Sequence, residues 1–319
     1  MGLSEFHAKD QELLDLLSQM IAIESINPEL SEQGSGETNL AEFLGAYLEA
    51  AGFEVHYQIF AENRKNIIAR LRGRGGGKHL MLNGHLDTVG VVGMDIYPYE
   101  ARIEEGRMYG RGSMDMKSGV AAMIMAAKRI KEAEISLRGD IILACVGDEE
   151  YLSKGTEKLL EDYTADAAIV PEPTDLEMVL AHKGFTWADF LVEGRAAHGS
   201  RPEVGKDAIL ESAYLLTELL KWEENELPKR QHPLLGRPSL HASIIEGGTE
   251  MSIYPHECNL SVEWRTLPGE DIAFVRKQTE EILRRLRKQK PDINISYELH
   301  SERKPLELKE SERICQCLG

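Results

Sequence analysis

Three separate apolar runs of this chain each end in residues that can bind a metal ion or move a proton. The runs cover 79–83, 139–147 and 167–170, and each is typical of a buried strand. The residues that follow them are His85 and Asp87, then Glu149 and Glu150, then Glu172. Imidazole and carboxylate groups are ligands of zinc, and a further carboxylate can act as a general base.

His85 and Asp87 lie two residues apart, directly after Gly84. In extended backbone this spacing puts both side chains on one face. A histidine with a carboxylate beside it looks like a zinc ligand and the partner that orients it. Taken alone, the pattern is more often a solvated pair at the end of a strand, because such short motifs match by chance.

A glycine-rich segment, Gly106–Gly119, follows the first run and carries Asp115. Its four glycines indicate a loop held close to another group. The G-K-[ST] ending and the G-x-G-x-x-G spacing of phosphate-binding loops are both missing from it. A helix is predicted over 121–130, which puts Asp115 near the N-terminal end of that helix.

Helices and strands alternate through the first part of the chain. Apolar spacing predicts helices over 10–23, 40–51 and 154–160, and strands over 53–60 and 66–71. Such alternation predicts an open α/β sheet, in which ligands bind beyond the carboxyl ends of the strands. The acidic residues and His85 would then meet at one edge of the sheet. A charged surface turn explains any one of the acidic clusters, but not easily all of them together.

The pattern changes after residue 180. The predicted order is strand, helix, strand, strand, helix, strand, over 185–192, 205–222, 240–245, 258–265, 271–288 and 293–299. This βαββαβ order is the ferredoxin-like arrangement. We therefore expect a first domain over 1–180, an inserted domain over 181–297, and a return to the first domain over 298–319.

Composition narrows the class of protein. The 319 residues are 42% hydrophobic and 29% charged, which is ordinary for a globular protein of two domains. A formal charge of −17 argues against nucleic acid or an anionic membrane as a partner. The four cysteines form no C-x-x-C pair, and the N-terminus does not resemble a signal peptide. A reduced, cytoplasmic location is the default expectation.

The donor set points to hydrolysis. Aspartate, glutamate and histidine without cysteine suit a catalytic zinc, cobalt or manganese ion. One imidazole and three or more carboxylates can hold two such ions about 4 Å apart, with one carboxylate bridging them. Such a pair activates water and polarises a carbonyl, which is the chemistry of amide cleavage. Adjacent side chains point in different directions, so one of two neighbouring glutamates can bind a metal ion while the other accepts the proton of the water.

In their order and spacing, five segments resemble the M20 family of dinuclear zinc metallopeptidases and amidohydrolases. That family includes acetylornithine deacetylase, succinyl-diaminopimelate desuccinylase and bacterial carboxypeptidases. The segments are 84–89, 110–119, 148–150, 171–173 and 197–202. The resemblance implies a zinc-hydrolase-like catalytic domain with a central mixed sheet flanked by helices. It also implies that the inserted domain serves dimerisation or acts as a lid, so a homodimer is expected.

The resemblance assigns the metal ligands. His85 would bind the first of two zinc ions, and Asp87 would orient its ring. Asp115 would bridge the two ions. Glu172 would complete the first site, and Glu150 would bind the second.

The resemblance also assigns the proton transfer and the substrate contacts. Glu149 would act as the general base. His198 would reach across a dimer to stabilise the tetrahedral oxyanion. Arg265 would hold a substrate carboxylate, although an ion pair with Glu263 or Asp271 is nearly as plausible for an arginine at a strand end.

The chain departs from the family pattern near its end. In the family, the second metal takes its last ligand from a histidine in the final segment, and no histidine follows His300 in this sequence. We therefore expect only the first metal site to be complete. We also expect the C-terminal part of the catalytic domain to be missing and hydrolysis to be weak or absent.

Three functions remain open. The leading hypothesis is a metal-dependent amidohydrolase of amino-acid biosynthesis that cleaves an N-acyl amino acid, as acetylornithine deacetylase does, and the segment 247–255 looks most like that branch. A desuccinylase, or a dipeptidase or carboxypeptidase acting on short peptides, is the nearest alternative. A non-catalytic binding or association protein is the third, which the missing histidine favours and the intact Glu149 and Asp87 oppose.

Overall fold

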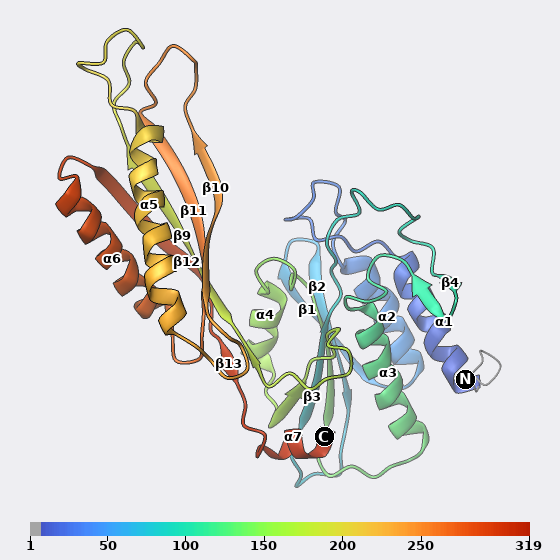
Figure 1. Cartoon of the computed structure of the whole chain (residues 1–319). Coiled ribbons are helices and arrows are strands. Elements are labelled where there is room, and N and C mark those ends of the chain that lie inside the picture. The colour runs from blue at the N-terminus through green and yellow to red at the C-terminus, as the bar shows by residue number, and fades with distance from the viewer. Residues whose placement is uncertain (1–7) are drawn as a thin grey trace. The chain divides into compact units, whose positions relative to one another are not determined.

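The computed structural model describes residues 8–319 (Figure 1). The chain divides into two compact units, Met1–Glu177 and Met178–Gly319. Each unit has its own sheet and its own hydrophobic core. Among the described residues, no helix has the length and apolar character needed to cross a membrane.

The first unit is built on a mixed five-stranded sheet. In spatial order its strands are β1 (Glu54–Ala61), β2 (Arg64–Leu71), β6 (Ile141–Val146), β3 (Leu80–His85) and β7 (Ala167–Ile169). β3 runs parallel to both β6 and β7, whereas β2 runs antiparallel to both β1 and β6. All six residues of β6 are buried, which explains its unbroken apolar sequence. The predicted α/β class with a mixed central sheet is confirmed.

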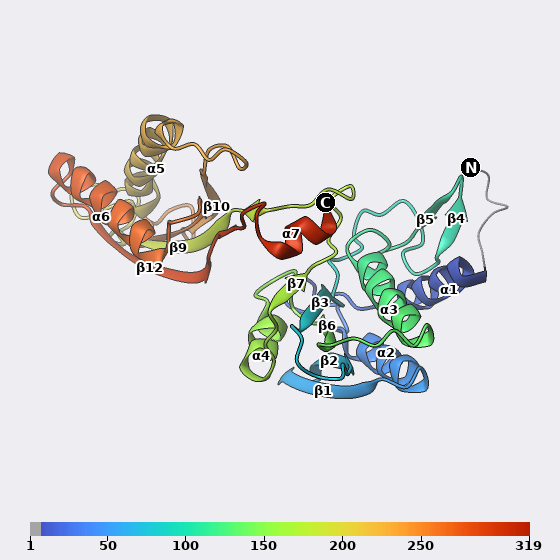
Figure 2. The same cartoon turned by 90° about the horizontal axis from the view of Figure 1, so that it is seen from below.

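Helices cover both faces of this sheet (Figure 2). They are α1 (Ala8–Ala22), α2 (Thr38–Ala50), α3 (Lys117–Glu132) and α4 (Lys154–Asp162). Ile67 on β2 packs in the core with α1, α2 and α3, whereas its neighbour Ile68 packs with Leu159 of α4 on the other face. Adjacent strand residues point to opposite faces, so each face of β2 is apolar. A short hairpin, β4 (Arg102–Glu104) and β5 (Arg107–Tyr109), precedes α3.

The second unit has the predicted βαββαβ order. Its elements are β9 (Gly184–Glu193), α5 (Ala208–Glu226), β10 (Ser239–Gly247), β11 (Glu257–Thr266), α6 (Ile272–Gln289) and β12 (Asn294–Arg303). The sheet order is β10-β11-β9-β12, and every pairing in it is antiparallel. Asp207 and Asp271 cap α5 and α6 by accepting hydrogen bonds from the main chain three residues on. Trp222 and Trp264 meet edge-to-face in the core with their ring centres 4.7 Å apart.

Some element bounds differ from those predicted. α5 begins at Ala208 instead of 205, because Asp207 is its cap. β12 continues to Arg303, four residues past its expected end, because it stays paired with β9. Two kinds of short element were not predicted, η2 (Leu227–Lys229) and the pair β8 (Ala181–His182) and β13 (Leu306–Glu307). The helix start expected at 315–319 is present as α7 (Arg313–Leu318). The expected return of 298–319 to the first domain stays a prediction.

Candidate metal centre

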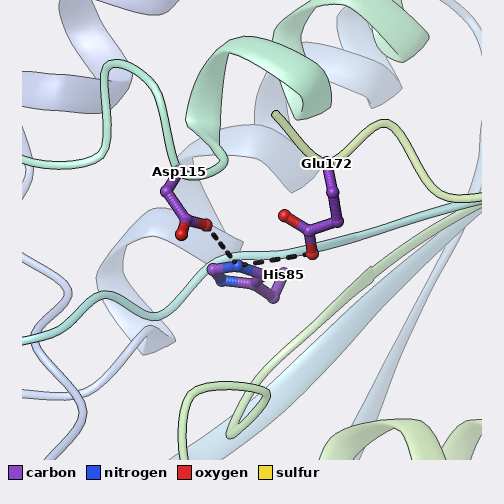
Figure 3. Close-up of side chains that lie close together, drawn as sticks. All are labelled: His85, Asp115 and Glu172. Atoms are coloured by element: carbon purple, nitrogen blue, oxygen red, sulfur yellow. Dashed lines mark hydrogen bonds and ion pairs between the residues drawn. The ribbon is translucent and has the colours of Figure 1, made fainter. Parts of the chain in front are cut away.

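His85 is the last residue of β3 and is 2% exposed. Its Nδ1 lies 2.8 Å from the main-chain oxygen of Asp87, which can only accept, so Nδ1 carries the hydrogen. Nε2 then faces Asp115 and Glu172, whose nearest oxygens lie at 3.1 Å and 3.8 Å (Figure 3). Histidine ligands of metal ions are oriented in this way, with the second ring nitrogen donating to a protein oxygen.

Two glycines bring the segments with these side chains together. A Cβ at Gly84 would lie 2.9 Å from Cγ2 of Val120, and a Cβ at Gly119 would lie 2.2 Å from the main-chain oxygen of Pro171. Gly84 therefore lets the end of β3 approach α3. Gly119 lets the first turn of α3 approach the segment that carries Glu172.

The three side chains fit a divalent metal ion. One ligand atom from each of His85, Asp115 and Glu172 lies within 4.8 Å of the other two. A nitrogen and two carboxylate oxygens suit a hydrolytic zinc site, in which three protein ligands leave one position open. No other group of histidine, cysteine, aspartate and glutamate side chains in the described part of the chain meets this geometry.

The charges of the site favour a bound cation. Burial alone would lower the pKa of His85, but the hydrogen bond to Asp115 and the neighbouring carboxylates raise it to about 10. Burial raises the pKa of both Glu150 and Glu172 to about 7, although the charge of His85 opposes this, and it also raises the pKa of Glu149. A cation beside buried carboxyl groups favours their ionised form. A divalent cation would supply such a positive charge.

The carboxylate of Asp87 differs from the expected orienting partner. Its Oδ1 lies 3.8 Å from Nδ1 of His85, which is too long for a hydrogen bond. Instead Oδ1 accepts from the amide of Glu149 at 3.1 Å, and Oδ2 accepts from the amide of Glu150 at 3.2 Å. Asp87 therefore contacts His85 through its main chain and holds the next acidic turn with its fully buried carboxylate.

Glu149 and Glu150 lie in the turn that follows β6. Oε2 of Glu149 is 3.7 Å from Nε2 of His85, so its carboxylate borders the triad without belonging to it. Glu150 is not one of the three converging ligands, although His85 and Asp115 both influence its pKa. The structure thus brings Glu149 to the site, and the role of Glu150 in a second metal site stays a prediction.

The structure also contains a buried polar network next to this turn, which the sequence analysis did not predict. Arg64 on β2 donates through Nε and Nη2 to Glu37 and through Nη1, at 2.8 Å, to Oδ1 of Asp148. Asn27 donates through Nδ2 to Oδ2 of Asp87 at 2.8 Å and to Oδ1 of Asp148 at 3.2 Å. All five residues are buried. Single polar residues of this kind have no periodic signal, and the position of Asp148 beside two glutamates was the one available clue.

His198 and Arg265 belong to the second unit. His198 is exposed, and its Nδ1 lies 2.8 Å from Oγ of Ser200. Arg265 forms an ion pair with Glu263 and lies over the ring of Phe185, 5.4 Å from the ring centre. The alternative pairing of Arg265 with Glu263 is therefore present. The oxyanion and substrate roles of these two residues stay predictions.

Fold and triad together define a class, an α/β protein with a three-ligand site of the kind that metal-dependent hydrolases use. Residues 81–317 match the profile described as peptidase family M20/M25/M40. The chain belongs to this family, whose members are hydrolases.

Named relatives support this membership, and a solved structure has the same fold. A peptidase M20 domain-containing protein of Schizosaccharomyces pombe is 32% identical, over 85% of this chain and 66% of its own length. An acetylornithine deacetylase of Myxococcus xanthus is 31% identical, over 79% of this chain and 68% of its own length. The crystal structure of a tripeptidase from Staphylococcus aureus has the same fold, with a TM-score of 0.76 at 20% identity over 97% of this chain and 80% of that one. The chain thus spans about two thirds of the length of these two relatives.

Proposed function

We propose that the chain provides the metal site and general base of an amidohydrolase that cleaves the amide bond of an N-acyl amino acid. The observation that carries the proposal is the orientation of His85. Its Nδ1 hydrogen is held by the Asp87 carbonyl, and its Nε2 faces two carboxylates. The named acetylornithine deacetylase relative supports the substrate class.

His85, Asp115 and Glu172 would hold the metal, with zinc first and cobalt or manganese as alternatives. When bound, such an ion lowers the pKa of water and polarises a carbonyl oxygen. Glu150 would contribute to a second ion that shares Asp115. The geometry of the triad predicts one tight site in this chain.

The side chains of the protein would move the proton and orient the substrate. Glu149 borders the triad and would take a proton from the attacking water, then return it to the leaving amine. In the second unit, His198 would donate to the developing oxyanion and Arg265 would hold the substrate carboxylate. The proposal includes a homodimer formed through the second unit, in which His198 of one subunit would act at the site of the other.

Metal binding tests the site independently of activity. The apo protein is dialysed against zinc and its metal content measured, for the natural chain and for His85→Ala. We expect zinc to bind the natural chain and the variant to bind at least about 10-fold more weakly, because it lacks the central ligand. Equal affinity in the two proteins would refute the assignment of His85.

Hydrolysis tests the base and the substrate class. Glu149→Gln should lower kcat by about 10²–10⁴-fold while zinc still binds, because only the proton acceptor is lost. Glu161→Gln, on the exposed side of α4, is the matched control and should leave kcat unchanged. Full turnover by Glu149→Gln would refute its role. Release of acetate from N-acetylornithine, compared with release of amino acids from dipeptides, separates the deacetylase from the peptidase alternative.

A further inference from the structure

Behind the candidate metal centre, one amide side chain joins two buried carboxylates. The two hydrogens of Nδ2 of Asn27 serve Asp87 at 2.8 Å and Asp148 at 3.2 Å. Asn27 itself is fully buried, and both its side-chain oxygen and its main-chain amide are hydrogen-bonded. Its Oδ1 accepts from the amide of Glu29, and its own amide donates to the main-chain oxygen of Thr88.

Both carboxylates hold the main chain that follows β6. Asp87 accepts hydrogen bonds from the amides of Glu149 and Glu150. Asp148 accepts from Arg64 and from the amide of Lys154 at 3.2 Å. The main chain at Asp148 has a φ of +65°, in the left-handed region that aspartate adopts more readily than most residues.

Without Asn27, these carboxylates would lack a shared donor. Arg64 is the one cation that contacts Asp148 among the described ion pairs, and it also serves Glu37. Asp87 has no cationic partner in the network apart from the imidazole of His85. Two buried carboxylates that are not bridged repel one another and leave lone pairs unsatisfied, which favours a shift of the turn.

We propose that Asn27 is a positioning residue that fixes the Glu149–Glu150 turn relative to Asp87, and thereby relative to His85. This inference rests on the proposed function for its effect on hydrolysis. It deepens that function, because the position of the base depends on a residue far away in the sequence. The described hydrogen bonds of Asn27 go to Asp87, Asp148, Glu29 and Thr88, and none goes to a ligand of the triad or to the base.

The test compares two substitutions with a matched control. Asn27→Ala removes the bridge, and Asn27→Asp keeps the shape but replaces both donated hydrogens by an acceptor. The control is Gln58→Ala, which removes another buried amide of the same unit. Gln58 donates to the main-chain oxygen of Lys158 at 2.8 Å and to Asp162 at 2.6 Å, and it accepts from Asn66 at 2.9 Å. None of these hydrogen bonds reaches Asp87 or residues 148–150.

Hydrogen exchange of the apo protein, followed by mass spectrometry, reads the turn directly. We expect the amides of Glu149 and Glu150 to exchange roughly tenfold faster in Asn27→Ala, because their acceptor is displaced. The amides of β6 serve as an internal reference for global stability. Both Asn27 variants should also bind zinc about 10–100-fold more weakly and lose a similar factor in kcat/KM. In Gln58→Ala, none of these three quantities should change.

If the amides of Glu149 and Glu150 exchange as slowly in Asn27→Ala as in the natural protein, the inference is wrong. A Gln58→Ala variant that loses as much zinc affinity as Asn27→Ala would also contradict it, because the effect would then be one of stability alone. If the natural protein hydrolyses no amide, the proposed function fails, and the exchange rates still decide the role of Asn27. If Asn27→Asp does not fold, Asn27→Ala carries the comparison.

Discussion

Gly119→Ala offers the sharpest test of how the metal centre is assembled. Gly119 is the third residue of α3, where alanine is normally more stable than glycine by about 1 kcal/mol. Helix propensity alone therefore predicts a more stable protein. The close approach to Pro171 predicts the opposite for the site.

The size of the effect follows from one distance. A Cβ at position 119 would lie 2.2 Å from the main-chain oxygen of Pro171, and ordinary contact needs at least 3.4 Å, so the backbones must separate by about 1.2 Å. Glu172 follows Pro171 directly and would move with it. Metal–ligand distances tolerate about 0.2 Å. We expect zinc affinity to fall about 10–100-fold, which corresponds to about 1.4–2.7 kcal/mol.

Competition with a chelator of known affinity measures this loss, and urea denaturation of the apo protein measures stability. The matched control is Gly45→Ala in α2. There a Cβ would meet the hydroxyl of Tyr57, the outer end of a side chain that is 43% exposed and can turn away. Gly45→Ala should keep full zinc affinity. Unchanged affinity in Gly119→Ala would refute the argument that this glycine positions Glu172.

Further predictions concern stability and reactivity. Arg64→Met leaves two buried carboxylates without their cation, so it should lower the free energy of unfolding by about 3–5 kcal/mol in urea denaturation, and a loss below about 1 kcal/mol would contradict this. Burial raises the pKa of the Cys145 thiol to about 12, so at pH 8 it stays protonated and should react with a disulfide reagent only after unfolding, whereas the exposed Cys317 reacts in the folded protein. Rapid modification of Cys145 in the folded chain, measured by mass spectrometry, would contradict this, because it would mean that β6 becomes accessible without unfolding. Asp271→Ala removes the cap of α6 and should cost about 1 kcal/mol, measured by thermal denaturation, against no change for Asp95→Ala in an exposed loop.

The fold could be predicted because its main elements have strong periodic signals. The runs that became β3 and β6 are apolar for a physical reason, since strands covered on both faces admit few polar side chains, whereas β7 is a partly exposed edge strand. Parallel pairing aligns β3 with both β6 and β7. Their carboxyl ends share one edge of the sheet, which is why His85 and Glu172 could be paired in advance. Short elements such as β8 and β13 escaped prediction because two paired residues have no period.

The candidate site was predicted less completely. Residue types and strand ends indicated a cluster at one edge of the sheet, and the family resemblance assigned its three ligands. The contact between Asp87 and His85 depends on backbone direction, which side-chain spacing does not encode. The network of Asn27 and Arg64 depends on which polar residues face one another across the core. Those contacts join positions 27, 64, 87 and 148, and single polar residues at such separations have no local pattern.

All three residues of the triad lie in the first unit, on segments that only the folded sheet brings together. An unfolded chain has no such cluster, so a metal ion would bind the folded first unit and not its unfolded form. At a free metal concentration 100 times Kd, that preference adds about 2.7 kcal/mol to the free energy of unfolding. Metal supply would then set how long the first unit resists proteases, while the second unit would gain no such protection from the ion.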